Sequence, residues 1–183
     1  TVDAAVYIKE WFKSGKWYGQ EMGYETLAEA IEALRVNAEN AENAGGEPVV
    51  TMIADSAESE IITVDKAVTI NGKGKKLTST AGRAINVDCA EEVIINDLVI
   101  EGGEGCQRGV NIINQASTTT LNNVKVSGVS HYAVHVATSA GAAKVNINGG
   151  SYTGYGALAI YGAGTVATVK DAVLVGVQLL GIH

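Results

Sequence analysis

Residues 109–128 read GVNIINQASTTTLNNVKVSG, and this stretch indicates the architecture because three other segments align with it. Each copy contains a short strand pattern, a variable turn, a second strand, a polar residue, a third strand and a glycine. The other copies are 84–102 (AINVDCAEEVIINDLVIEG), 133–154 (AVHVATSAGAAKVNINGGSYTG) and 157–176 (ALAIYGAGTVATVKDAVLVG). The polar positions Asn96, Asn122, Asn148 and Lys170 are spaced 26, 26 and 22 residues apart. The chain is therefore a repeat protein, and residues 62–80 read as an earlier, degenerate copy.

A repeat of this length with three short strands is typical of a solenoid whose strands pair in parallel from coil to coil. Alternation along each strand predicts three inward columns. They are Ile85/Val87 with Val110/Ile112, Val134/Val136 and Leu158/Ile160; Ile95 with Leu121, Ile147 and Val169; and Ile100 with Val126, Tyr152 and Leu174. The asparagines Asn96, Asn122 and Asn148 are expected to mark a sharp bend and to form a hydrogen-bonded ladder.

The first 47 residues predict a cap on this solenoid. Residues 4–18 suggest two short strands around a Ser14-Gly15 turn. Thr26 and Glu29 form a capping box, and the apolar face of the helix that follows contains Leu27, Ala30, Ile31 and Leu34. We therefore expect a single domain over 1–183, with a cap over 1–47 and coils over 48–183.

Charge is distributed unevenly along the chain. The net charge is −7, but residues 1–104 hold 19 acids and 9 bases whereas residues 105–183 hold one acid and four bases. An acidic chain does not favour nucleic acid as a partner. The sequence also has no apolar run of about 18 residues and no signal peptide pattern, so membrane insertion is not expected. Because residues 105–183 contain one carboxylate, this part of the chain is not expected to carry out acid–base catalysis.

The segments IINDLVIEG, TLNNVKVSG and VNINGG resemble the repeat of the right-handed parallel β-helices of the pectin-lyase-like superfamily. The opening YETLAEAIEAL, VVTMIAD and ITVDKAVTINGKGKKLTS is similar to that of secreted or surface-attached β-helix proteins of bacteria. The resemblance spans about residues 24–176. It implies an all-β solenoid, a right-handed single-stranded parallel β-helix with an N-terminal α-helical cap, located outside a bacterial cell or on its surface.

This fold hosts lyases, hydrolases, adhesins and phage tailspikes, so it does not determine the function. The paired DD, GHG and RxK motifs that the resemblance would imply for a polygalacturonase are absent from the sequence. We expect a non-enzymatic module, an adhesin-like stalk or a surface that binds extracellular polysaccharide or cell-surface glycan. The alternative is a polysaccharide lyase or glycoside hydrolase of the superfamily.

Aromatic rings stack on sugars, so Tyr132, Tyr155 and Tyr161, with His135 beside them, are the candidate ligand-binding residues. His135 falls in an outward column with Asn86 and Asn111, and surface exposure is the favoured interpretation for both His131 and His135.

One coil carries a group of acids that could hold Ca²⁺ through oxygen ligands. The other interpretation of this group is a solvated loop face. The acids are Asp88, Glu91, Glu92, Asp97, Glu101 and Glu104, with Arg108 nearby.

Cys89 and Cys106 lie roughly one coil apart and fit either a disulfide or two buried thiols. The stretch 173–183 carries apolar outward residues and no obvious cap. There are three interpretations of this end: the native chain is longer, residues 177–183 close the end, or two molecules associate end to end or edge to edge. The first two are favoured.

Overall fold

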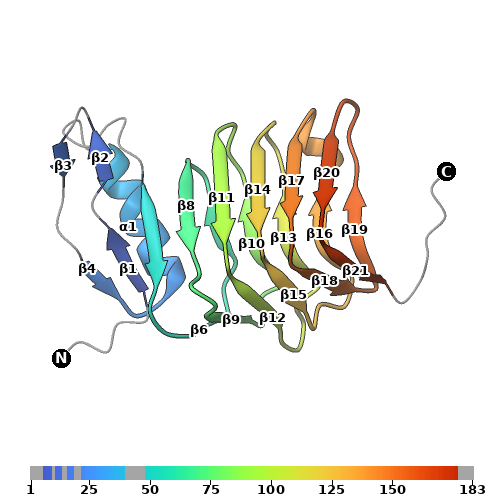
Figure 1. The fold of residues 1–183 in the computed structure, drawn as a ribbon, viewed down its shortest axis with the longest axis horizontal. Coiled ribbons are helices and arrows are strands. Elements are labelled where there is room, and N and C mark those ends of the chain that lie inside the picture. The colour runs from blue at the N-terminus through green and yellow to red at the C-terminus, as the bar shows by residue number, and fades with distance from the viewer. Residues whose placement is uncertain (1–5, 10, 14–15, 19–21, 40–47, 177–183) are drawn as a thin grey trace.

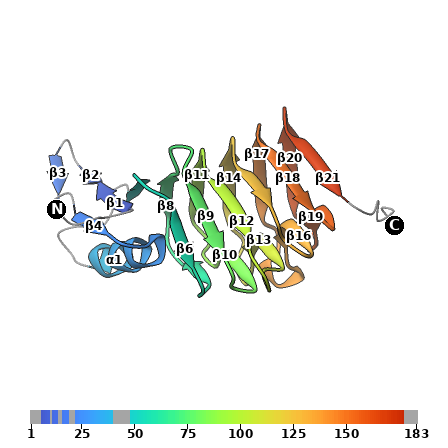
Figure 2. The same ribbon diagram turned by 90° about the horizontal axis from the view of Figure 1, so that it is seen from below.

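The computed structural model describes residues 6–9, 11–13, 16–18, 22–39 and 48–176, with side chains described over 23–34 and 48–176 (Figure 1). From residue 49 onward the chain winds through three parallel sheets in turn, one strand per sheet per coil. Figures 1 and 2 show the coils stacked along the long axis of the molecule. This confirms the predicted all-β parallel β-helix with one helix in its N-terminal cap.

The three sheets are named here in the order in which the chain visits them. Sheet I contains β5 (Val49–Met52), β8 (Val68–Asn71), β11 (Glu92–Asn96), β14 (Thr118–Asn122), β17 (Lys144–Asn148) and β20 (Val166–Lys170). Sheet II contains β6 (Ser56–Glu58), β9 (Lys76–Ser79), β12 (Val99–Gly102), β15 (Lys125–Ser127), β18 (Ser151–Gly154) and β21 (Val173–Gly176). Sheet III contains β7 (Ile62–Val64), β10 (Arg83–Val87), β13 (Arg108–Ile112), β16 (Tyr132–Val136) and β19 (Gly156–Ile160). A short 3₁₀ turn, η1 (Thr138–Ala140), lies between β16 and β17.

The register of these strands reproduces the predicted columns. In sheet I, for example, Ile95 pairs with Leu121, and Leu121 with Ile147, and all three side chains are fully buried. The column ends differ: Val169 and Leu174, in the last described coil, are 39% and 43% exposed because no further described coil covers them. Residues 177–183, one of the interpretations of which was closure of the solenoid end, lie outside the described part.

An asparagine ladder crosses the C-terminal ends of the strands of sheet I, as predicted, and begins one coil earlier than expected. The Nδ2 atom of each residue donates to the Oδ1 atom of the one before it. The links are Asn96 to Asn71 (2.9 Å), Asn122 to Asn96 (2.8 Å) and Asn148 to Asn122 (2.9 Å).

The bend after this ladder lies one residue later than expected. The ladder asparagines end their strands, and the left-handed backbone belongs to the next residue, with φ of 49° at Asp97 and 51° at Asn123. An extended backbone at the ladder position keeps its amide in register with its neighbours, so the turn falls on the residue that follows. Asp97 and Asn123 form a second link, with Asn123 Nδ2 donating to Asp97 Oδ1 at 2.9 Å.

The cap is joined to the first coil through sheet I and through a helix. Strand β1 (Val6–Lys9) pairs antiparallel with β5 and with β4 (Met22–Tyr24), while β2 (Trp11–Lys13) and β3 (Lys16–Tyr18) form the predicted hairpin. Helix α1 (Leu27–Glu39) lies at the N-terminal end of the stack, where Leu27, Ala30, Ile31 and Leu34 are buried (Figure 2).

The N-terminus of α1 is capped by its own residues and by the first coil. Thr26 Oγ1 accepts the Glu29 N–H at 3.2 Å, as the capping box predicts. Two β6 side chains accept further helix N–H groups: Ser56 Oγ from Leu27 at 3.3 Å and Glu58 Oε1 from Ala28 at 2.8 Å. Because these donors would otherwise have no partner, the capping bonds tie the helix to the solenoid.

Candidate functional site

A second ladder crosses the outer face of sheet III. Asn86, Asn111 and His135 occupy the same register position in three neighbouring strands. Asn111 Nδ2 donates to Asn86 Oδ1 at 2.9 Å, and His135 Nδ1 lies 2.8 Å from Asn111 Oδ1. Arg108 Nη1 donates to the same Asn111 oxygen at 3.1 Å. Asn111 therefore joins an asparagine, a histidine and an arginine from three coils.

These contacts assign the imidazole tautomer. The amide nitrogen of Asn111 is used as a donor to Asn86, so its oxygen is the acceptor that faces both Arg108 and His135. The Nδ1 atom of His135 must then carry the proton. In the neutral ring this leaves Nε2 as an acceptor.

Aromatic rings surround this histidine. The Tyr132 and His135 rings are stacked, with centroids 5.6 Å apart and an interplanar angle of 22°. The Tyr161 ring is also near, with its centroid 5.6 Å from that of His135 and an interplanar angle of 56°. Tyr132 also lies over Gly156, its register partner in the next coil, where an added Cβ would be 2.9 Å from the tyrosine ring.

The expected exposure of His135 is wrong, although its outward column is right. Its side chain is only 7% exposed, because Tyr132 and Tyr161 cover it. Burial, followed by the positive charges of Arg108 and Arg83, lowers the pKa of His135 to about 4. The ring is therefore neutral at pH 7. His131 is exposed as expected, with Ser130 Oγ 3.4 Å from its Nδ1 atom.

Two arginines belong to the same site and were not among the candidate residues. Arg83 and Arg108 start β10 and β13 and are register partners. Burial and the charge of Arg83 lower the pKa of Arg108, and its buried Nε atom has no hydrogen-bond partner in the described residues. A signal for the pair was present in the sequence, since the two arginines are 25 residues apart, the length of one coil.

We call this surface the Arg–Tyr face. It consists of Arg83, Arg108, Tyr132, His135, Tyr155 and Tyr161. Tyr155 and Tyr161 are the outer members, 39% and 46% exposed. Tyr132 interacts with both of them, and burial together with the hydrogen bond to Tyr161 raises the pKa of Tyr132. The four residues predicted to bind ligand therefore lie together, on a support of asparagines and arginines.

The acids predicted to hold calcium do not converge, so that expectation is corrected. In the described residues, no group of three or more His, Cys, Asp or Glu side chains is placed to hold a metal ion. Glu91 accepts the Ala67 N–H at 2.7 Å, and Glu101 pairs with Lys76 at 2.9 Å on sheet II. Asp97 and Asp88 accept hydrogen bonds from Asn123 and Asn114.

The physical reason is the path of the coil. Glu92 lies on sheet I, Glu101 on sheet II, and Asp88 and Asp97 in turns outside those strands. Acids that are close in sequence therefore lie on different sides of the solenoid.

The two cysteines are free and buried, which agrees with the thiol alternative and corrects the disulfide. Cys106 precedes β13 and Cys89 follows β10, and these two strands are paired in parallel. The sulfur atoms therefore lie at opposite ends of a strand pair five residues long. Desolvation raises the pKa of both thiols.

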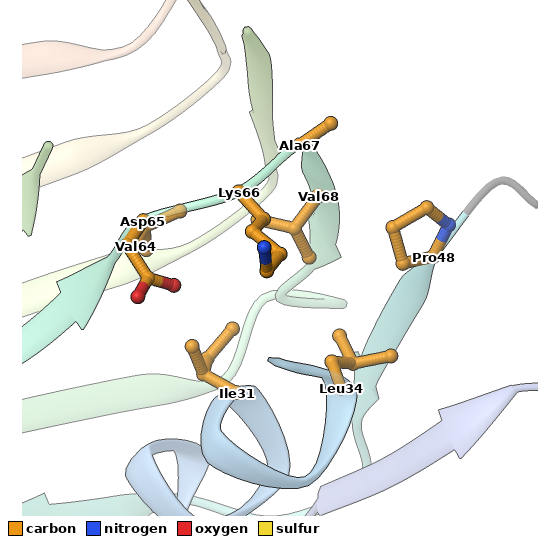
Figure 3. Close-up of a pocket in the computed structure, with 8 residues that line it drawn as sticks. All are labelled: Ile31, Leu34, Pro48, Val64, Asp65, Lys66, Ala67 and Val68. Carbon is orange, nitrogen blue, oxygen red and sulfur yellow. The ribbon is translucent and has the colours of Figure 1, made fainter. Parts of the chain in front are cut away.

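Three cavities in the described part of the chain lie away from the Arg–Tyr face. A cavity of about 20 Å³ lies between α1 and the first coil, where Ile31 and Leu34 face the loop 64–68 (Figure 3). It has room for about one water molecule. An open groove of about 260 Å³ is bordered by Lys73, Asp97, Asn123 and Lys125, and another of about 290 Å³ lies along sheet I near Pro48 and Glu92. None of the three includes a residue of the Arg–Tyr face.

Among the described residues, no helix is both long and apolar enough to cross a membrane. Comparison of the chain with protein family models, with curated proteins and with solved structures finds no match.

Proposed function

We propose that this chain is a non-enzymatic β-helix module that binds glycan through the Arg–Tyr face. The observation that carries the proposal is the gathering of three rings, Tyr132, His135 and Tyr161, on one outer sheet face. Aromatic faces stacked beside hydrogen-bonding groups suit a sugar, which presents apolar C–H faces and polar edges.

Rigidity supports the same proposal. Tyr132 and His135 lie on β16, which pairs with β13 on one side and β19 on the other, and the Asn86–Asn111–His135 ladder links the outward residues of β10, β13 and β16. Tyr161 directly follows β19. A surface held in this way loses little conformational entropy when it binds a ligand. The same stacking supports a second role as a stiff stalk that displays the surface.

The contacts of the Arg–Tyr face favour binding over hydrolysis. Glycoside hydrolysis uses a pair of carboxylates, whereas the described side-chain contacts of this face are to asparagine, arginine and tyrosine. The resemblance to pectin-lyase-like proteins of bacterial surfaces supports a location outside the cell, where polysaccharide or cell-surface glycan is the partner.

The test is a glycan array combined with polysaccharide degradation assays, with and without calcium. We expect binding without cleavage, and we expect Tyr161→Ala to weaken it. Ile53→Ala is a matched control, because Ile53 is 45% exposed against 46% for Tyr161 and lies in the turn after β5, a strand of sheet I. Cleavage of any polysaccharide would support the lyase or hydrolase alternative and overturn the proposal. So would an array without a binding partner, or equal binding by the two variants.

A further inference from the structure

We infer that Arg83 and Arg108 hold a tetrahedral oxyanion, a sulfate or phosphate ester, on the sugar that contacts the tyrosines of the Arg–Tyr face. This inference rests on the proposed glycan binding and names the chemical class of the ligand. It starts from the register of sheet III, which places the two arginines side by side at the start of β10 and β13. Neighbouring strands are about 4.8 Å apart.

The first argument is the unbalanced charge. No ion pair joins Arg83 or Arg108 to a carboxylate in the part of the chain that the structure describes. The two guanidinium groups repel each other, and both disfavour the protonated form of His135. An anion between them would remove this repulsion.

The second argument is the supply of unused donors. A guanidinium carries five N–H donors, and the described side-chain hydrogen bonds of Arg108 use one, from Nη1 to Asn111. The Nε atom of Arg108 is buried and unpartnered. Because a buried donor without an acceptor is unfavourable, an oxyanion that accepts from Nε would remove an unfavourable feature of the site.

The third argument selects the shape of the anion. A planar carboxylate has two oxygens, and one guanidinium fork is enough to bind both. Two forks from neighbouring coils suit a group with three terminal oxygens, which sulfate and phosphate esters have. The exposed Tyr155 and Tyr161 lie on the same face, so they are placed to contact the sugar that carries the ester.

The experiment uses four sugars that differ only at C6: glucose 6-sulfate, glucose 6-phosphate, glucuronic acid and glucose. Their dissociation constants are measured by titration against the full chain. We expect one or both esters to bind at least about ten-fold more tightly than glucuronic acid, because a third oxygen allows the second guanidinium to form charge-assisted hydrogen bonds as well. We expect the same margin or more over glucose, which carries no charge. The stronger of the two esters identifies the group.

The variants are Arg83→Gln and Arg108→Gln, each expected to weaken ester binding about ten-fold or more. Arg108→Lys keeps the charge but loses the fork, so it is not expected to restore binding. Lys125→Gln is the control, because Lys125 is an exposed cation on sheet II. A second readout is the pKa of His135, measured by NMR. This pKa should rise when the ester binds, because the negative charge of the ester offsets the positive charges of the arginines beside Tyr132 and Tyr161.

Each other outcome is decisive. Equal binding of the four sugars, or unchanged ester binding in Arg83→Gln, overturns the inference. If glycan binding responds to Tyr161→Ala but not to either arginine variant, the inference fails and the proposed function stands. If the array is empty but inorganic sulfate or phosphate binds and depends on both arginines, the anion site stands and the glycan function fails.

Discussion

Removal of a central member of the sheet I ladder tests whether the stacked amides stabilise the solenoid. Asn122 makes two ladder bonds, donating to Asn96 at 2.8 Å and accepting from Asn148 at 2.9 Å, whereas Asn148 makes one ladder bond within the described residues, to Asn122. A hydrogen bond contributes about 0.5–1.5 kcal/mol net. We therefore expect Asn122→Ala to lower the free energy of unfolding by about 2 kcal/mol and Asn148→Ala by about 1 kcal/mol.

The assay is urea unfolding at fixed temperature and pH, followed by circular dichroism. At an m value of about 2.5 kcal/mol/M, the loss in Asn122→Ala lowers the midpoint by about 0.8 M. Thr118→Ala is the control on the same strand, because the Thr118 side chain has no hydrogen bond in the described residues. Asn122→Asp separates the two bonds, since a carboxylate can accept from Asn148 but faces the oxygen of Asn96.

Two results would refute this reasoning. One is an equal loss of stability in Asn122→Ala and Asn148→Ala, which would mean that the number of ladder bonds does not matter. The other is a midpoint for Asn122→Ala that matches that of Thr118→Ala. Either would show that water replaces the ladder bonds at no loss.

Three further predictions concern Tyr152, His135 and Gly128. Tyr152 is fully buried among core residues, and its hydroxyl has no hydrogen-bond partner in the described residues. Tyr152→Phe should therefore raise the free energy of unfolding, measured by urea unfolding, by about 1 kcal/mol; a clear loss of stability would show a partner for the hydroxyl. The pKa of His135 is about 4 in the folded chain and about 6.5 in the unfolded chain. Between these pH values the unfolded state binds one more proton than the folded state. The free energy of unfolding therefore falls as the pH drops from 6.5 to 4, by at most about 1.4 kcal/mol per pH unit. His135→Asn, which keeps the ladder pattern, should flatten that part of the stability profile, and an unchanged slope would contradict the assignment. At Gly128, φ is +75° and an added Cβ would clash with the Gly102 carbonyl oxygen. A left-handed backbone alone costs a residue other than glycine about 1–2 kcal/mol, so with the clash Gly128→Ala should lower the free energy of unfolding by about 3 kcal/mol, as measured by thermal unfolding. Gly74→Ala is the control, because Gly74 has a similar φ of +76° and open space around the added Cβ.

The candidate site was only partly predictable from the sequence. The outward column of Asn86, Asn111 and His135 followed from the repeat, and Tyr132 and Tyr161 were named as binding residues. Their contact with His135 was not predictable, because Tyr161 reaches the histidine from the following coil through a turn whose path alternation does not specify. The pairing of Arg83 and Arg108 was present as a 25-residue spacing but becomes meaningful only once the register is known.

By itself, the sequence determined what repeats along the axis of this protein: the coil, its inward columns and its asparagine ladder. These features follow from backbone pairing between equivalent residues, which a periodic pattern of apolar and polar residues specifies. Only the tertiary structure decided which side chains lie close together around the circumference of each coil. It separated the acids at Asp88, Glu92 and Glu101 onto different sides, kept Cys89 and Cys106 apart, and buried His135 beneath two tyrosines. The physical reason is that positions around a coil depend on the angles and lengths of its turns, where side-chain periodicity is lost.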